Sequence, residues 1–123
     1  MHLINACNEN QLREKELEVF SFPAWHGLLM GLECEEILRG KQTFSYLLRE
    51  GEGRFHYYLS YVLEAPFVYK HQPFAITLEN SKIGVGYMNT HTWWAEKVED
   101  LIPLIMHHPA EKCIPILNKR SLS

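Results

Sequence analysis

The segment from Thr43 to Glu52 constrains this chain most, because it places one arginine, Arg49, at the end of an otherwise apolar strand. Glycines at positions 51 and 53 follow and provide a turn. A guanidinium is always charged and forms paired hydrogen bonds with phosphate or carboxylate groups. Leaving that charge unpaired among leucines costs free energy. The segment therefore predicts an anion receptor at the end of the strand.

The composition predicts one globular domain with a single core, since 46% of the 123 residues are hydrophobic and 22% are charged. The formal net charge of −3 argues against general electrostatic attraction to nucleic acid or to an anionic membrane. We therefore expect neither of these partners. We expect a monomer whose anion binding comes from a few local positive groups.

The three cysteines, Cys7, Cys34 and Cys113, are odd in number and share no short spacing, which argues against a disulfide framework or a structural zinc site. No apolar run approaches the length of a transmembrane helix, and the amino terminus lacks the basic and apolar regions of a signal peptide. We expect free thiols in a reducing, cytoplasmic compartment, with no metal and no cofactor.

Three regions are predicted along the chain. Residues 1–22 form a leader or short helix outside the main core, residues 23–118 form the folded domain, and residues 119–123 form a tail. The domain opens with a helix over residues 31–39, which Gly40 ends. Its apolar face is formed by Leu32, Cys34, Ile37 and Leu38, and its solvated side by Glu33, Glu35 and Glu36.

Three strands follow at residues 44–49, 55–62 and 67–77, which are rich in Tyr, Phe, Val and Leu. Their short connections favour an antiparallel meander. Both alternating faces of the first strand are apolar, so we expect the sheet to be covered on both sides. Pro73 marks a bulge or a sheet edge in the third strand.

A second helix is predicted after a turn at residues 80–86 and a brief strand at residues 87–88. Thr92 is its candidate cap, and we expect it to pack on the sheet face opposite the first helix. The helix has Pro103 as its one discordant residue, and its apolar stripe consists of Trp94, Val98, Leu101, Ile102 and Ile105. With a last small strand at residues 113–117, the pattern predicts an α+β fold, a central antiparallel β-sheet flanked by two α-helices.

Five short motifs now occur in one order, and together they resemble the Src homology 2 (SH2) domain, the phosphotyrosine-binding module of signalling proteins. The resemblance covers about residues 25–117. The motifs are Trp25-His-Gly27, Tyr46-Leu-Leu-Arg-Glu-Gly-Glu52, Tyr57-Tyr-Leu-Ser60, Lys70-His71, and Trp94 with the aliphatic residues that follow it. They resemble, in this order, the tryptophan and glycine at the start of the family's domain, its arginine signature, its next two strands and its second helix.

The resemblance implies a phosphotyrosine peptide bound across one edge of the sheet, with Arg49 gripping the phosphate at the base of a pocket. The glycine-bearing loop would wrap the phosphate with backbone amides. His71 would lie beside the phosphotyrosine ring or order the pocket. The implied site is formed by Arg49, Glu50, Gly51, Glu52, Gly53, Arg54 and His71, and the implied peptide surface by Tyr69, Lys70 and Gln72.

The chain departs from the family pattern at three places. Gly51 replaces the serine of the signature, Gly31 and Leu32 stand where many members supply a second arginine, and Pro73 stands where a lysine is common. We interpret the chain as a divergent member with shallow selectivity for the residues that flank the phosphotyrosine. Divergent SH2 domains also occur in effectors that intracellular bacteria deliver into host cells, and such an origin would place the chain in the host cytoplasm.

Alternatives to this interpretation stay open at the sequence level. In the structural interpretation, Arg49 pairs with a surface carboxylate and His71 is a hydrogen-bonded histidine of the sheet. Arg54 is then a solvated charge in the loop. The chain is then an interaction scaffold that uses exposed aromatic residues. A small hydrolase would need Cys34 or Cys113 with a histidine, or the carboxylates of residues 50 and 52, and neither set has a supporting motif, so we expect no enzyme.

Overall fold

The structure is a computed structural model that describes residues 9–88 and 92–118. Cys7, the first eight residues of the predicted leader and the predicted tail at residues 119–123 lie outside the described residues. The helices are α1 (Glu9–Phe20), α2 (Gly31–Leu38) and α3 (Val98–Met106), with one turn of 3-10 helix at Ala110–Lys112. The strands are β1 (Ser45–Glu50), β2 (His56–Glu64), β3 (Val68–Glu79), β4 (Lys82–Met88), β5 (Thr92–Ala95) and β6 (Ile114–Pro115).

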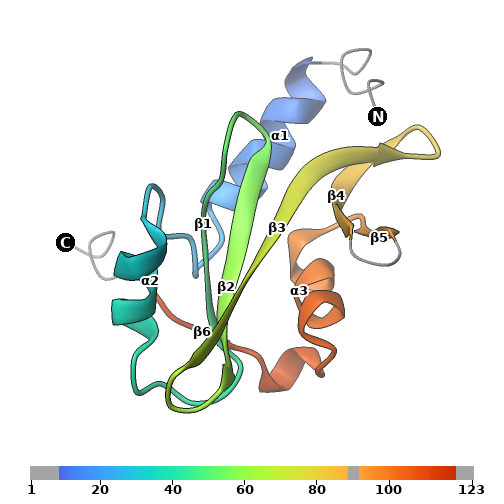
Figure 1. The fold of residues 1–123 in the computed structure, drawn as a ribbon. Helices are drawn as coiled ribbons and strands as arrows, with labels where there is room; N and C mark the ends of the chain where they lie inside the picture. Colours follow the sequence, from blue (N-terminus) through green and yellow to red (C-terminus); the bar gives the residue numbers. More distant parts are fainter. Residues whose placement is uncertain (1–8, 89–91, 119–123) are drawn as a thin grey trace.

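The six strands form one sheet in the order β5-β4-β3-β2-β1-β6 (Figure 1). Neighbouring strands are antiparallel except β6, which runs parallel to β1. The predicted α+β fold and the antiparallel meander of β1, β2 and β3 are confirmed, whereas β6 makes the sheet mixed at one edge. Pro73 lies in the part of β3 that pairs with β2 alone, because pairing with β4 begins at Ala75. The predicted edge at Pro73 is therefore present.

The prediction of a long turn before a brief strand is wrong. Only Asn80 and Ser81 form the turn, with φ angles of 51° and 66°, and β4 then runs for seven residues. Two residues with positive φ form the tight turn that suits the twist of a β-hairpin. Gly84 belongs to β4, where it pairs with Thr77, and a Cβ atom there would lie 2.4 Å from Cζ2 of Trp94. The sequence pattern took this glycine as a sign of a turn, but in the structure it allows the ring of Trp94 to pack closely.

The second predicted helix begins later than expected. Residues 92–95 form β5, in which Trp94 pairs with Gly86 of β4, so neither Thr92 nor Trp94 belongs to α3. The helix starts at Val98, whose backbone N–H donates to Glu18 Oε2 at 2.7 Å. The remaining positions of the predicted stripe are buried as expected, and they are Val98, Leu101, Ile102 and Ile105.

Two apolar clusters lie on opposite faces of the sheet. The larger cluster joins α1 and α3 to one face, where it includes Tyr46 and Leu48 of β1. The smaller cluster joins α2 to the other face, where it includes Leu47. Figure 1 shows α2 and α3 on the two sides of the sheet, so the predicted two-sided cover is confirmed. Leu32 does not belong to the apolar face of α2, because it is 80% exposed.

Helix α1 packs into the larger cluster, and the expectation that it lies outside the main core is wrong. Leu12 and Val19 are buried there at 5% and 0% exposure. Polar contacts fix the same helix to the start of α3, since Lys15 Nζ donates to the carbonyl oxygen of Glu96 at 2.6 Å. Part of the region that the sequence pattern assigned to a leader or short helix therefore packs with the core.

Replacing Leu12 with alanine tests this packing. We expect a loss of about 2 to 5 kcal/mol in the free energy of unfolding, because the truncation leaves a cavity in the core. Leu17→Ala in the same helix is the matched control, since Leu17 is 61% exposed and its truncation should change stability by less than about 0.5 kcal/mol. Urea unfolding measures both, and equal stabilities would show that α1 is not part of the core.

Candidate functional site

Arg49 lies near the end of β1 and is buried, with 8% of its surface exposed. Side chains alternate along a strand, so Arg49 and Leu47 point to the same face of the sheet, the one that α2 covers. In the register of the sheet, Arg49 lies opposite Tyr58 of β2. The carbon of its guanidinium is 4.4 Å from the centre of the Tyr58 ring, which is cation–π distance.

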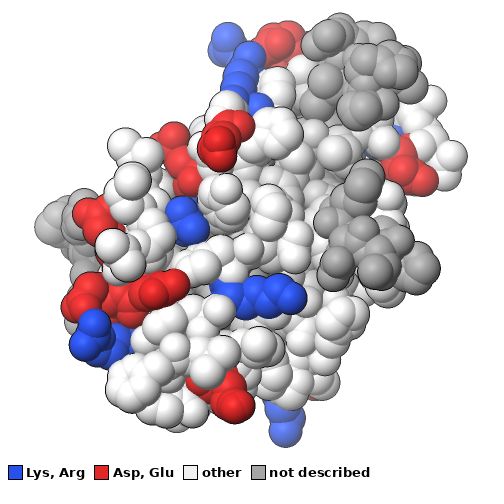
Figure 2. Space-filling model, viewed as in Figure 1, with Lys and Arg blue, Asp and Glu red and all other residues white. Residues whose placement is uncertain are grey.

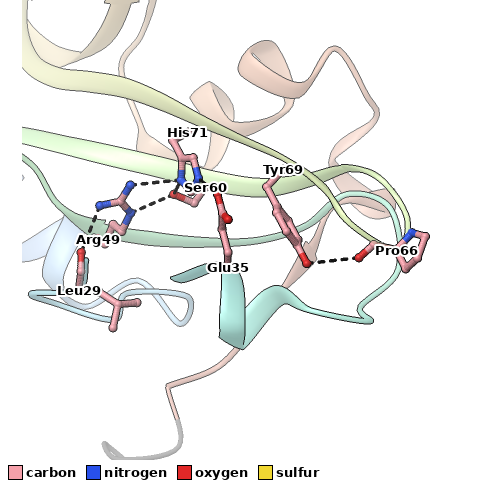
Figure 3. Close-up of polar contacts among 7 residues, drawn as sticks. All are labelled: Leu29, Glu35, Arg49, Ser60, Pro66, Tyr69 and His71. Atoms are coloured by element: carbon pink, nitrogen blue, oxygen red, sulfur yellow. Dashed lines mark hydrogen bonds and ion pairs between the residues drawn. The ribbon is translucent and has the colours of Figure 1, made fainter. Parts of the chain in front are cut away.

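Three neutral acceptors hold the Arg49 guanidinium (Figure 3). Nε donates to Ser60 Oγ at 3.0 Å, one terminal nitrogen donates to the carbonyl oxygen of Leu29 at 3.1 Å, and the other donates to His71 Nδ1 at 3.2 Å. These contacts fix the orientation of the side chain. They occupy three of its five N–H groups and leave its charge uncancelled.

No carboxylate lies within 4.0 Å of the Arg49 guanidinium in the part of the chain that the structure describes. The alternative of an arginine paired with a surface carboxylate therefore finds no partner among residues 9–88 and 92–118. A buried charge without a counter-charge is costly, and an anion that reached the guanidinium would offset that cost.

His71 connects the arginine to an acid on α2. It lies opposite Ser60 in the register of β2 and β3, and its Nδ1 is 2.7 Å from Ser60 Oγ. Its Nε2 is 2.8 Å from Glu35 Oε2. Because Arg49 can only donate, Nδ1 is an acceptor, and Nε2 carries the proton that it donates to Glu35.

The sequence pattern missed three members of this cluster, namely Leu29, Glu35 and Ser60. Glu35 was predicted on the solvated side of α2, but its carboxylate contacts His71. A signal for it existed, because Glu35 precedes the buried Leu38 by three residues and so lies on the same side of the helix. Ser60 lay inside a quoted motif, whereas no sequence pattern indicated the carbonyl oxygen of Leu29.

The loop after β1 has less freedom to wrap an anion than the resemblance implies. The backbone N–H of Glu50 donates to the carbonyl oxygen of Gly27 at 2.9 Å, and that of Gly51 donates to the carbonyl oxygen of His56 at 2.9 Å. Gly53 adopts a φ of 95°, and the side chains of Glu50 and Glu52 are exposed. The structure thus brings Arg49 and His71 together, while two of the expected amides already have protein partners.

Arg54 lies in a different cluster. Its guanidinium donates to both carboxylate oxygens of Glu16 at 3.0 Å and to Glu9 Oε2 at 2.9 Å, both on α1. The hydrogen bond from Arg54 holds the pKa of the Glu9 carboxyl below its ordinary value. Arg54 therefore joins the loop to α1, and we do not carry it into the proposed site.

The three residues of the implied peptide surface point to both faces of the sheet. Tyr69 packs on the α2 face and borders a groove of about 380 Å³ together with Leu32 and Phe67. Lys70 lies opposite Tyr61, a residue of the larger cluster, and so points to the other face. Gln72 also points there and is buried, with its amide donating to the carbonyl oxygen of Pro73 at 3.0 Å.

Charged groups give no broad basic surface on the face that Figure 2 shows, where lysine and arginine side chains lie at separate places among acidic and uncharged residues. No helix within residues 9–88 and 92–118 has the length and apolar character needed to cross a membrane. The same residues contain no cluster of three histidine, cysteine or acidic side chains suited to a metal ion.

The cysteines that a hydrolase would need are poor nucleophiles here. Cys34 is fully buried, and burial raises the pKa of its thiol. Burial likewise raises the pKa of the Cys113 thiol, whose Sγ lies 3.4 Å from the carbonyl oxygen of Pro109. A nucleophilic cysteine needs a lowered pKa and access to substrate. Neither Cys34 nor Cys113 has these properties.

Gly51→Ser restores the serine of the family signature, and we expect it to destabilise the domain by about 1 to 3 kcal/mol. A Cβ atom at Gly51 would lie 2.9 Å from the backbone of His56 and Tyr57, closer than side chains tolerate. Gly31→Ser is the control, because nothing lies within 4 Å of a Cβ there. Thermal unfolding compares the two, and a Gly51→Ser protein as stable as its control would contradict the close approach.

Comparison with known proteins gives one type of match. No family model matches the sequence, and no curated protein matches it. Among solved structures, the chain is similar to the solution NMR structure of the SH2 domain of the CRK/CRKL homologue from Monosiga brevicollis. The two are 22% identical, the TM-score is 0.49, and the match covers 70% of this chain and 75% of that one. The α+β fold class of the chain follows from its own strands and helices.

Proposed function

We propose that this chain is a divergent SH2-like domain that binds tyrosine-phosphorylated peptides or proteins, with Arg49 gripping the phosphate. One observation carries the proposal: a guanidinium that is 8% exposed is held by three neutral acceptors and has no carboxylate within 4.0 Å among the described residues. A site of this kind is prepared for an anion. Binding leaves the phosphopeptide chemically unchanged.

The chemistry of the ligand matches the charge of the site. A phosphate on tyrosine carries close to two negative charges and three acceptor oxygens, whereas an unmodified tyrosine offers one hydroxyl. Arg49 Nε donates to Ser60 Oγ at 3.0 Å, while its two terminal nitrogens make the longer contacts, at 3.1 and 3.2 Å. A phosphate that approached these nitrogens would replace uncharged acceptors with charged ones and could accept from both nitrogens at once, in the paired arrangement that guanidinium groups form with phosphate.

Exposed apolar residues adjoin Leu29, the residue whose carbonyl oxygen accepts from Arg49. They are Leu28, Met30 and Leu32, and Leu32 stands where many SH2 domains supply a second arginine. These side chains contact the phosphotyrosine ring or an aliphatic residue next to it in the peptide. Such apolar contacts depend little on the identity of the neighbouring residue. We therefore propose that the phosphotyrosine itself supplies most of the affinity. We place this function in the cytoplasm, or in the host cytoplasm if the chain is a bacterial effector.

Arg49→Ala should weaken binding of a phosphotyrosine peptide by about 2 to 5 kcal/mol, because it removes the charged partner of the phosphate. Titration calorimetry measures the affinity, with the unmodified peptide and a phosphoserine peptide as ligand controls. Arg54→Ala is the matched protein control. It removes an arginine that is half exposed and paired with α1, so the affinity should stay within about twofold.

Arg49 is buried, so its replacement could also affect folding. Arg49→Lys is therefore measured beside Arg49→Ala, and the melting temperature of each variant is recorded. Lysine keeps the positive charge but loses the planar fork that grips two oxygens, so its affinity should lie between the wild type and the alanine variant. A folded Arg49 variant that still binds the phosphopeptide within twofold would contradict the proposal. Equal binding of the phosphorylated and unmodified peptides would instead indicate a scaffold that needs no phosphate.

Shallow selectivity is tested with a panel of phosphotyrosine peptides whose flanking residues vary. We expect their dissociation constants to fall within about tenfold, or 1.4 kcal/mol, of one another. Fluorescence polarisation with a fixed labelled peptide as competitor provides the ranking. Differences of a hundredfold between peptides would show that the domain reads the flanking sequence.

A further inference from the structure

Glu35, His71 and Arg49 form a chain in which one imidazole lies between a carboxylate and a guanidinium (Figure 3). The carboxylate of Glu35 is 2.8 Å from Nε2 of the ring, and the guanidinium is 3.2 Å from Nδ1. One side of the ring therefore faces a negative charge and the other a positive charge. The protonation of such a ring depends on which charge faces each nitrogen.

In the free site the ring has a reason to stay neutral. A proton on Nδ1 would create a second positive charge that points at the Arg49 guanidinium, and it would remove the acceptor that both Arg49 and Ser60 use. Like charges at this distance disfavour the protonated form. Nε2 already carries the proton donated to Glu35.

The groups that face His71 come from every element packed around it. Strand β1 contributes Arg49, strand β2 contributes Ser60, and helix α2 contributes Glu35. On the same face, Tyr69 of β3 directs its hydroxyl to the carbonyl oxygen of Pro66 at 3.3 Å. The thiol of Cys34 on α2 stays neutral, because burial raises its pKa. The ring thus has one acid and one obligate cation as its charged neighbours among the described residues.

A bound phosphate reverses the charge on one side of the ring. When the terminal nitrogen of Arg49 donates to a phosphate oxygen, Nδ1 loses the guanidinium as its partner and faces a dianion instead. A proton from the buffer then stabilises the site, because the imidazolium donates from Nε2 to Glu35 and from Nδ1 to the phosphate. An opposite charge within about 4 to 6 Å favours the charged form of a group.

We propose that Glu35 is a positioning residue that makes His71 the second cationic donor of this site, so that phosphotyrosine binding is coupled to the uptake of one proton. The proposal rests on the function proposed above and deepens it. It explains how a pocket with Gly31 and Leu32 in the place of a second arginine supplies a second positive charge to a doubly charged phosphate. Glu35 acts through His71 and needs no contact with the ligand.

Calorimetry can count the protons taken up on binding. One phosphotyrosine peptide is titrated at pH 7.5 in several buffers that differ in ionisation enthalpy. The ligand enters as a dianion at this pH, because the second pKa of its phosphate is about 6. We expect more than about half a proton per bound peptide for the wild type, since the ring starts neutral. Glu35→Gln should lower both the proton count and the affinity, the latter by about tenfold.

Two further variants separate proton coupling from a structural role. His71→Asn keeps a hydrogen-bonding group near the Nδ1 position but cannot titrate, so it should bind with a proton count near zero. Glu36→Gln is the matched control, because it neutralises the neighbouring acid of the same helix, which pairs with Arg39 and not with His71. Its proton count should equal that of the wild type.

The outcomes distinguish this inference from the function on which it rests. Binding that depends on Arg49 but takes up no proton would overturn the role of Glu35 and His71 and leave the proposed function standing. A proton count that survives in His71→Asn, or that falls equally in Glu35→Gln and Glu36→Gln, would also overturn it. Absence of phosphopeptide binding in the wild type would overturn both proposals.

Discussion

A buried guanidinium with no carboxylate partner among the described residues dominates the α2 face of the sheet. Hydrogen bonds to Ser60, Leu29 and His71 satisfy Arg49 in part, and the ring of Tyr58 lies against it, yet none of these groups cancels its charge. The register of β1, β2 and β3 brings these side chains to one place. The opposite face is filled by the larger apolar cluster with α1 and α3, whereas the α2 face holds both the smaller cluster and the proposed anion site.

Elements with one dominant signal could be predicted from the sequence. Strands β1, β2 and β3 and helix α2 follow from their apolar periodicity and their turns. Predictions were wrong where two rules competed: Gly84 indicated a turn but accommodates the ring of Trp94, and Trp94 fitted a helical stripe but belongs to β5. Helix α1 was placed outside the core because its own pattern is weak, and the burial of Leu12 depends on a sheet formed later in the chain.

The candidate site divides in a similar way. Arg49 and His71 could be predicted because their side chains carry distinctive chemistry within motifs at fixed spacings. For Glu35 the spacing from Leu38 indicated only the side of the helix, and its contact with His71 depends on the rotation of α2 against β3, which no local pattern fixes. Arg54 is the opposite case. It lies in the loop that the resemblance assigned to the site, but it pairs with acids of α1 that lie about forty residues earlier.

The most direct test of the account follows the terminal N–H resonance of the Arg49 guanidinium by NMR during titration with free phosphotyrosine, with tyrosine and phosphoserine as comparisons. The account predicts that this resonance shifts and saturates with phosphotyrosine and stays in place with tyrosine, because the guanidinium exchanges neutral acceptors for a phosphate. An Arg49 resonance that remains unchanged while other signals of the protein saturate would contradict the claim that this buried charge is the anion receptor.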